Sequence, residues 1–274
     1  MRTQKAALVT GASSGIGKAT AKQLLDDGLI VYGAARRIEK MKDLEELGAY
    51  AIQMDITKER DVQNVIDTIQ KNHGGVDVLV NNAGYAIYGA VEDTSIEDAR
   101  RQFDVNLFGL ARLTQLVLPH MREQQWGKII NMSSMGGKIY TPLGAWYHAT
   151  KHALEGWSDC LRLELKEFNI DVVVIEPGIV TTEFGDVLHQ PLLERSGEGP
   201  YSELAKAVAK STVESYEKGA GTDPSVIAKM ISKAVAAKNP KTRYAKGKLA
   251  KPLIWMRRWF GDSMFDKIVM SQVS

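Results

Sequence analysis

Cysteine, net charge and long apolar runs are all scarce in this sequence, and each absence excludes a class of protein. Among 274 residues Cys160 is the single cysteine, so no disulfide can form within the chain, which fits a reducing compartment. The charged and polar residues around Cys160 predict a packing residue of a helix rather than a nucleophile. The formal net charge of +2 is too close to balance to indicate a nucleic-acid partner.

A leader segment and a membrane-spanning segment are also missing from the pattern. Residues 1–5 run directly into the apolar stretch 6–9, and no apolar run reaches the roughly 20 residues that a spanning helix needs. We therefore expect a cytoplasmic protein. With 44% hydrophobic residues the chain can bury a full core, and its length suits a single α/β domain over residues 1–274.

Short apolar stretches alternate with helical patterns along most of the chain. Strands are predicted at 6–10, 29–34, 50–54, 76–80, 127–132 and 171–175, and helices at 58–71 (with Thr57 as its cap), 95–121 and 145–168. This alternation is typical of βαβ units and favours an α/β fold: a Rossmann-type doubly wound parallel sheet of about seven strands flanked by helices. Ligands bind such sheets at the carboxyl ends of the strands.

The first predicted strand ends in a glycine-rich turn that opens a helix. Gly11 permits the tight turn, Gly15 lets the backbone approach a pyrophosphate, and Gly17 lets the helix pack closely on the strand. The spacing is G-x-x-x-G-x-G, not the more familiar G-x-G-x-x-G. A glycine turn without a ligand is the alternative. We predict a dinucleotide site formed by Gly11, Ser13, Ser14, Gly15, Ile16 and Gly17.

The end of the second predicted strand carries Arg36 and Arg37, where a dinucleotide fold contacts the adenosine ribose. An acid there would accept from a free 2′-hydroxyl, whereas a guanidinium matches a 2′-phosphate. The acid is missing and Ser13 can add a hydroxyl, so NADP(H) is favoured over NAD(H). Alternatively, the two arginines only open a basic loop.

The ends of the third and fourth predicted strands supply further candidates. Asp55, followed by Ile56, is placed to accept from an adenine amino group, although it could equally be a carboxylate of a structural turn. The segment of Asn82, Ala83 and Gly84 is small enough to lie against the adenosine ribose. Asn81 is interpreted as a structural amide that ties neighbouring strands together.

Tyr147 and Lys151 lie one helical turn apart in the predicted helix 145–168. An ammonium beside a phenol favours the phenolate and lowers its pKa from about 10, so that the phenol can exchange a proton with an alcohol. The pattern Y-x-x-x-K is also common on solvated helix faces, so it indicates a catalytic pair only if the chain builds a cofactor site around it. Asn106 is an amide among apolar residues, and a satisfied core amide is one explanation of it.

These motifs together resemble the short-chain dehydrogenase/reductase family over roughly residues 5 to 185. The matching segments are 10–17, 81–84, Ser134, Tyr147-x-x-x-Lys151 and Pro177-Gly178. The resemblance implies that Tyr147 is the general acid/base, that Lys151 lowers its pKa and holds the nicotinamide ribose, and that Ser134 binds the substrate oxygen. Ser133 is one residue out of register. Asn106 would position a water of a proton relay, and Thr182 would contact the nicotinamide carboxamide, with Pro177, Gly178 and Val180 completing the cofactor site.

The segment 183–221 is expected to form a lid over the substrate. Its apolar side chains and those of the loops below it predict a hydrophobic pocket. Ser134, Tyr147, Met135, Trp146, Phe184 and Leu188 are the substrate candidates; Tyr85, Ile87, Tyr88, Leu143, Val187, Leu192, Leu193 and Tyr201 are further lining candidates, unless they only pack the lid. His189 is expected to be solvated.

The length and lid resemble the branch of 17β-hydroxysteroid and retinol dehydrogenases, which implies a steroid-, retinoid- or lipid-like ketone or aldehyde interconverted with its alcohol. A carbonyl reductase for a hydrophobic substrate is therefore predicted. The alternatives are a 3-oxoacyl thioester reductase and a catalytically silent NADP(H)-binding sensor or scaffold. No metal is expected. By resemblance, pairing through the helices at 95–121 and 145–168 would give a homodimer or homotetramer.

The C-terminal extension, residues 241–274, combines cations with aromatic residues. Seven Lys/Arg and no acids occur between Lys241 and Arg258, followed closely by Trp259 and Phe260. We favour a tail whose aromatic face packs on the lid or on a partner subunit while its charges are solvated. The other interpretation is a basic amphipathic helix that touches an anionic membrane.

Overall fold

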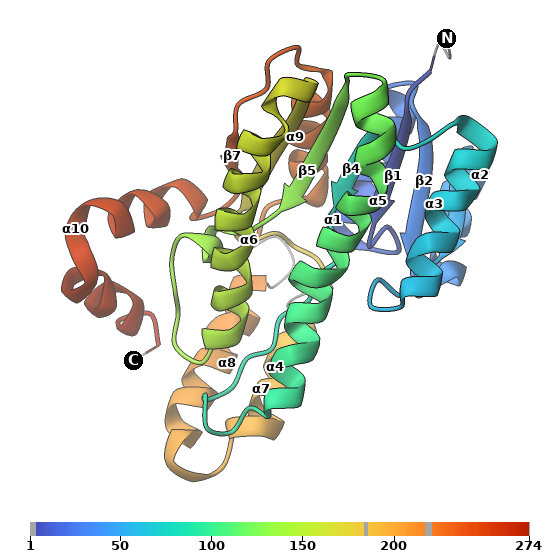
Figure 1. Cartoon of the computed structure of the whole chain (residues 1–274). Coiled ribbons are helices and arrows are strands. Elements are labelled where there is room, and N and C mark those ends of the chain that lie inside the picture. Colours follow the sequence, from blue (N-terminus) through green and yellow to red (C-terminus); the bar gives the residue numbers. More distant parts are fainter. Residues whose placement is uncertain (1–3, 184–185, 217–220, 274) are drawn as a thin grey trace.

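The structure, a computed structural model, describes residues 4–183, 186–216 and 221–273 (Figure 1). Seven strands form one parallel sheet in the order β3-β2-β1-β4-β5-β6-β7. This confirms the predicted doubly wound sheet. The strands are β1 (Ala6–Thr10), β2 (Ile30–Ala35), β3 (Tyr50–Gln53), β4 (Val78–Asn81), β5 (Gly127–Met132), β6 (Ile170–Pro177) and β7 (Arg243–Lys246).

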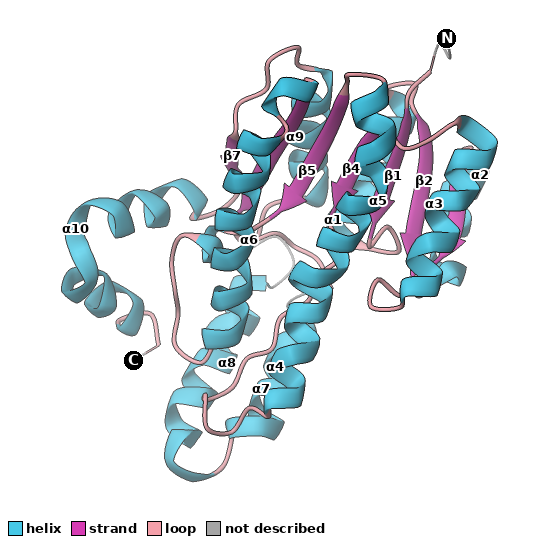
Figure 2. Cartoon of the chain, in the orientation of Figure 1, coloured by secondary structure: helices cyan, strands magenta, loops and turns pink. Residues whose placement is uncertain are grey.

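Helices cover both faces of this sheet (Figure 2). Alternate residues of a strand point to opposite faces, so Ala7 and Val9 of β1 enter one core cluster and Ala6 and Leu8 the other. One face is covered by α1 (Gly15–Asp26), η1 (Ile38–Met41), α2 (Lys42–Glu46) and α9 (Pro224–Ala236). The other face is covered by α3 (Glu59–His73), α5 (Leu110–Glu123) and α6 (Ala145–Glu164). Both faces are therefore buried, as the apolar strand sequences require.

The strand order places a crevice at the carboxyl edge of the sheet. β1 lies between β2 and β4, so the connections after β1 and after β4 leave in opposite directions. The loops from these strand ends diverge there, and this is where open α/β sheets bind ligands. The glycine turn after β1 and the segment after β4 both lie at this point.

The expected helix 95–121 is confirmed as a continuous helical stretch, which consists of α4 (Ile96–Phe103), a π-helical turn η2 (Asp104–Gly109) and α5. Two local predictions were wrong. Lys58, not Thr57, is the residue that precedes α3, and the Thr57 hydroxyl donates to Asp55 Oδ1 at 2.8 Å. Cys160 is exposed on α6 rather than packed.

The lid and the C-terminal extension lie outside the two layers that cover the sheet. α7 (Asp186–Ser196), η5 (Gly199–Tyr201) and α8 (Ser202–Tyr216) form the lid below the sheet, whereas α10 (Ala250–Met270) stands to one side (Figure 1). The short helices η3 (Met135–Gly137) and η4 (Lys166–Phe168) flank α6. Within the described residues no helix is both long and apolar enough to cross a bilayer.

Candidate active site

The glycine turn after β1 has the shape of an anion cradle. Gly11 and Gly15 have φ values of 68° and 54°, a left-handed conformation that other residues adopt at a cost. A Cβ on Gly17 would collide with the carbonyl oxygen of Gly11, so α1 packs directly on the turn. The first N–H groups of α1 have no partner within the helix, which makes its start suited to an anionic group. Ser13 is buried within this turn, and Ile16 packs against the core.

Cations at the end of β2 reach this turn. The Arg37 Nη2 donates to Ser14 Oγ at 3.2 Å and to Glu183 Oε2 at 3.0 Å, and Lys40 Nζ lies 3.1 Å from Glu183 Oε1. Lys40 and Arg37 together hold the pKa of the Glu183 carboxyl below its usual value. The structure thus brings Arg37 beside the glycine turn, where it already holds an anionic group. Arg36 instead acts electrostatically on Asp55.

The segment after β4 is fastened to β1. Thr10 Oγ1 accepts from the backbone N–H groups of Asn82 at 3.0 Å and Ala83 at 2.9 Å, and Asn82 Nδ2 donates to the Thr10 carbonyl at 2.8 Å. Asn81 Nδ2 donates to Asn131 Oδ1 at 2.9 Å, which links β4 to β5. Asn81 therefore has the structural role predicted for it, and residues 82–84 border the crevice.

Asp55 closes a local turn. Its Oδ1 accepts from the Thr57 backbone N–H at 3.1 Å and from the Thr57 hydroxyl, while Ile56 is buried beside it. The structural interpretation of this carboxylate is confirmed. Its contact with adenine stays a prediction.

Tyr147, Lys151 and Ser134 come together at the ends of β5 and α6. Tyr147 and Lys151 are both buried on one face of α6, with Lys151 Nζ 5.9 Å from the centroid of the Tyr147 ring. The Ser134 hydroxyl acts on the Tyr147 phenol and lowers its pKa, and Ser134 Oγ accepts from the Gly136 N–H at 3.0 Å. Lys151 Nζ donates to the Met132 carbonyl at 2.8 Å. Because Ser134 Oγ accepts from the backbone, its own proton is free for the phenol or another oxygen.

The expected fall in the pKa of Tyr147 is wrong for this arrangement. Burial raises the pKa of the phenol, the Ser134 hydrogen bond lowers it, and the nearby Tyr88 phenol raises it further. Burial also lowers the pKa of Lys151 to about 8, although the Glu155 carboxylate opposes this fall. At neutral pH the phenol therefore retains its proton and the lysine retains its charge.

His148, the residue after Tyr147, holds the loop that carries Ser134. Its Nε2 accepts from the Thr141 N–H at 3.1 Å, so the proton is on Nδ1, which donates to the Gly136 carbonyl at 2.9 Å. Burial lowers the pKa of His148, which favours this neutral form. The Gly136 N–H contacts Ser134 Oγ in turn, so His148 positions the serine loop against α6.

Asn106 lies in the π-helical turn and is fully buried. Its Oδ1 accepts from the Tyr85 N–H at 3.0 Å, and its Nδ2 donates to the Tyr85 carbonyl at 2.9 Å and to Thr150 Oγ1 at 3.1 Å. The interpretation as a satisfied core amide is thus confirmed. A Cβ built on Gly84 would lie 3.2 Å from Asn106 Oδ1 and 3.7 Å from Lys151 Nζ, so both side chains border the same glycine. The proposed relay water stays a prediction.

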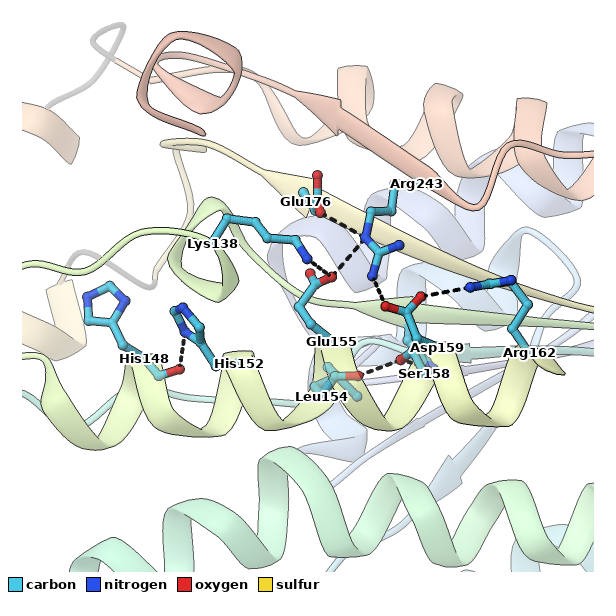
Figure 3. Close-up of polar contacts among 11 residues, drawn as sticks. Lys138, His148, His152, Leu154, Glu155, Ser158, Asp159, Arg162, Glu176 and Arg243 are labelled. Carbon is cyan, nitrogen blue, oxygen red and sulfur yellow. Dashed lines mark hydrogen bonds and ion pairs between the residues drawn. The ribbon is translucent and has the colours of Figure 1, made fainter. Parts of the chain in front are cut away.

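A buried cluster of charges lies one turn beyond Lys151 (Figure 3). Glu155 Oε2 is 2.8 Å from Lys138 Nζ and 3.0 Å from Arg243 Nε. Arg243 also reaches Asp159 at 2.7 Å and Glu176 at 3.4 Å. Burial and the neighbouring Glu155 carboxylate raise the pKa of Glu176 to about 7. The cluster joins α6 to β6 and β7 and keeps a carboxylate charge near Lys151.

The chain leaving β6 passes close to the glycine turn. A Cβ on Gly15 would lie 3.0 Å from Thr182 Cγ2, which places Thr182 across the cradle. Gly178, which follows Pro177, packs so tightly on the Lys248 carbonyl that no side chain fits there, and Val180 bridges to Thr222. The predicted cofactor residues after β6 therefore lie on the same edge as those after β1.

The lid covers Tyr147 with apolar side chains. Leu188 of α7 forms a buried cluster with Ala86 and Tyr147, against which Tyr88 packs. Leu192, Leu193 and Leu143 belong instead to the packing between α7 and α8. This agrees with the alternative that these residues only pack the lid. Met135 and Trp146 are half-buried beside the serine loop, and the Trp146 Nε1 is buried without a hydrogen-bond partner. Phe184 lies outside the described residues, as does the side chain of Val187.

A groove of about 540 Å³ opens next to this region and is lined by Tyr140, Leu143, His148, His152, Tyr201 and Leu204 among others. Neither Tyr147 nor Ser134 lines it. Leu143 and Tyr201 therefore line this groove rather than the expected pocket above the phenol. His189 is half-buried on α7.

Three neighbours of the Tyr147–Lys151 pair were missed by the sequence argument. Tyr216 of α8 acts on the Tyr147 phenol together with Tyr88, which was a predicted lining candidate, and burial raises the pKa of both. No local pattern could reveal contacts between such distant segments. His148 and Glu155 could have been found, because they directly follow Tyr147 and lie one turn after Lys151, respectively.

The site is that of an oxidoreductase built on a dinucleotide-binding sheet, and comparisons with known proteins define the family. The family model described as short chain dehydrogenase matches residues 5–191. The chain therefore belongs to the short-chain dehydrogenase/reductase family, whose oxidoreductases interconvert carbonyl and alcohol groups.

Known relatives match almost the whole chain. A 3-ketodihydrosphingosine reductase of Bacteroides thetaiotaomicron is 37% identical, covering 94% of both chains. An NADPH-dependent 3-dehydrocapnine reductase of Ornithobacterium rhinotracheale is 36% identical, covering 96% of this chain and 95% of that one. A short-chain dehydrogenase structure from Streptomyces avermitilis superposes with a TM-score of 0.83 at 34% identity, covering 98% and 96% of the two chains. The similarity thus includes the C-terminal extension.

Proposed function

We propose that this protein is an NADPH-dependent reductase of a hydrophobic ketone or aldehyde. The observation that carries the proposal is the placement of a buried phenol, Tyr147, beside the Lys151 ammonium and near the Ser134 hydroxyl at the carboxyl edge of the sheet. A protonated phenol, a hydroxyl donor and a fixed cation are the groups that reduction of a carbonyl requires from a protein.

In this proposal NADPH, when bound, supplies the hydride. The substrate oxygen then gains negative charge, and the Ser134 hydroxyl donates a hydrogen bond to it. The Tyr147 phenol transfers its proton to the same oxygen, which leaves a phenolate. Lys151, still charged at neutral pH because its pKa is about 8, stabilises that phenolate. The raised pKa of Tyr147 keeps the phenol protonated, which is the form that can donate a proton to the substrate oxygen.

The preference for NADPH rests on the groups around Ser14. Arg37 and Lys40 hold a carboxylate there, and a 2′-phosphate would offer the same cations an anion of higher charge. No acidic residue ends β2 to bind a free ribose hydroxyl. The name of the Ornithobacterium relative, which specifies NADPH, supports the same cofactor. Gly11, Ser13, Gly15, Ile16 and Gly17, together with Asn82–Gly84, Asp55 and Thr182, would hold the remainder of the nucleotide.

The substrate class rests on the surroundings of the phenol. Leu188, Ala86 and Tyr88 cover Tyr147 with apolar surface, which suits a hydrophobic carbonyl compound. The names of both relatives are those of reductases, and one specifies a keto compound. We therefore propose the same type of reaction for this chain, the reduction of a carbonyl group, but not the same substrate.

Pairing of subunits is supported by two exposed apolar residues. Phe108 in η2 is 59% exposed and Leu163 on α6 is 65% exposed. They lie on the two helices through which the resemblance predicts a homodimer or homotetramer, and burial in a partner would remove them from water.

A panel assay tests the proposed function. Purified protein is mixed with aliphatic ketones, aldehydes, quinones and 3-oxoacyl thioesters, and consumption of NADPH and NADH is followed. We expect turnover of a hydrophobic ketone or aldehyde with a lower KM for NADPH. Preference for the thioester would favour the alternative reductase. Tight NADPH binding without turnover on any substrate would identify a sensor and contradict the proposal.

A further inference from the structure

The first half of α10 carries large aromatic side chains into solvent. Trp255 is 55% exposed, Trp259 is 65% exposed and Phe260 is 48% exposed. Packing of this face on the lid, which the sequence favoured, is therefore wrong within one protomer, since the buried residues of α10 are Ala250 and Phe265. Trp255 and Trp259 are four residues apart and precede the kink at Gly261, so they share one face.

Cations occupy the same face as the tryptophans. Lys251 lies one turn before Trp255, and Arg258 lies three residues after it. The guanidinium of Arg258 is 5.5 Å from the Trp259 ring centroid. The first acid of α10 is Asp262, which pairs with Arg257 at 2.6 Å. The exposed face before the kink therefore has only positive charge.

The second half of α10 fixes this face relative to the body. Phe265 is fully buried and contacts the Tyr140 ring, and Asp266 Oδ1 accepts from the Tyr140 hydroxyl at 2.8 Å. α10 stands to one side of the domain, beyond α6 (Figure 1). The aromatic face is thus presented by an anchored helix and is not part of a loose tail.

We propose that the face of Lys251, Trp255, Arg258, Trp259 and Phe260 binds an anionic phospholipid surface. Tryptophan is enriched at the level of lipid headgroups, where its ring is apolar and its N–H remains hydrated, and cations beside it bind anionic headgroups. The helix lies on the surface and does not cross it, because no described helix is suited to span a bilayer.

A second copy of the chain is the competing occupant, and charge disfavours it. If a two-fold axis passes through this face, Lys251 and Arg258 meet their own copies with no acid on that face to compensate them. An anionic membrane offers complementary charge for each of these cations.

Vesicle co-sedimentation tests this proposal with the full-length protein. We expect binding to vesicles of phosphatidylcholine mixed with phosphatidylglycerol, and at least tenfold weaker binding to phosphatidylcholine alone or at high salt. Trp255→Ser with Trp259→Ser, and separately Lys251→Gln with Arg258→Gln, should each reduce binding at least tenfold. Leu47→Ser, which alters an exposed apolar residue directly after α2, is the matched control and should bind like the wild type.

Folding of each variant is checked by circular dichroism and thermal unfolding. Absence of binding to anionic vesicles by the folded wild type would overturn the proposal, as would variants that bind normally. A wild-type oligomer that dissociates in the double tryptophan variant, with no vesicle binding, would assign the face to a second copy instead.

Discussion

Glu155→Gln tests the electrostatic support of Lys151. Side chains four residues apart on a helix lie about 5–6 Å apart at Cβ, so at an effective dielectric constant of about 20 a carboxylate and an ammonium attract by about 3 kcal/mol. Lys138 and Arg243 share the same carboxylate and reduce the part that acts on Lys151. A net effect of about 1.4 kcal/mol equals one pKa unit.

The pKa of Lys151, about 8, should therefore fall by about one unit in Glu155→Gln. Lysine is charged below its pKa, so the loss of charge, and of phenolate stabilisation, begins at lower pH in the variant. We expect kcat/KM of the wild type to decrease above about pH 8 and that of the variant to decrease about one pH unit earlier.

The assay is initial NADPH consumption across the pH range, with thermal unfolding at each pH to exclude loss of folding. Glu164→Gln, an exposed substitution at the end of the same helix, is the control and should leave the profile unchanged. If the profiles of Glu155→Gln and the wild type superimpose, Glu155 does not support the charge of Lys151.

Three further predictions concern the surroundings of the site. Arg37→Ala should raise KM for NADPH at least tenfold with little change for NADH, since a charge-assisted hydrogen bond contributes about 1.5–3 kcal/mol; an equal change for both cofactors would contradict this. The pKa of Glu176 is about 7 in the folded protein, above its ordinary value of 4.5. The folded state therefore loses stability as the pH rises from about 4.5 to about 7 and this carboxyl ionises. Glu176→Gln should therefore raise Tm at pH 8 but not at pH 4, and equal shifts at both would refute the assignment. His148→Phe should lower kcat about tenfold, by releasing the Ser134 loop, without changing the Kd for NADPH; unchanged kcat would exclude this positioning role.

Local patterns in the sequence were sufficient for the sheet and for the residues at its carboxyl edge. Alternating apolar stretches, a glycine turn and strand-end polar residues are each set by neighbours in the chain. Parallel strands bring their carboxyl ends together, so Gly11, Arg37, Asn82, Ser134 and Thr182 were expected on one edge, and the structure places them there.

The errors arose where distant segments decide the environment. The pKa of Tyr147 depends on burial beneath Leu188, Tyr88 and Tyr216, which come from loops and helices far along the chain. The helical periodicity of the sequence also did not predict the π-helical turn at Asn106, whose amide hydrogen-bonds the backbone of Tyr85. The exposure of Trp255 on α10 likewise depends on the direction that the C-terminal extension takes after β7.

The most direct test of the central claim is a comparison of Tyr147→Phe with the wild type. Phenylalanine keeps the buried ring beside Lys151 but removes the hydroxyl that would donate the proton. We measure NADPH affinity by fluorescence titration and turnover on the best carbonyl substrate of the panel. The account predicts an unchanged Kd for NADPH and a loss of at least 100-fold in kcat, in the range of general acid catalysis. Near-wild-type turnover in this variant would contradict the assignment of Tyr147 as the proton donor.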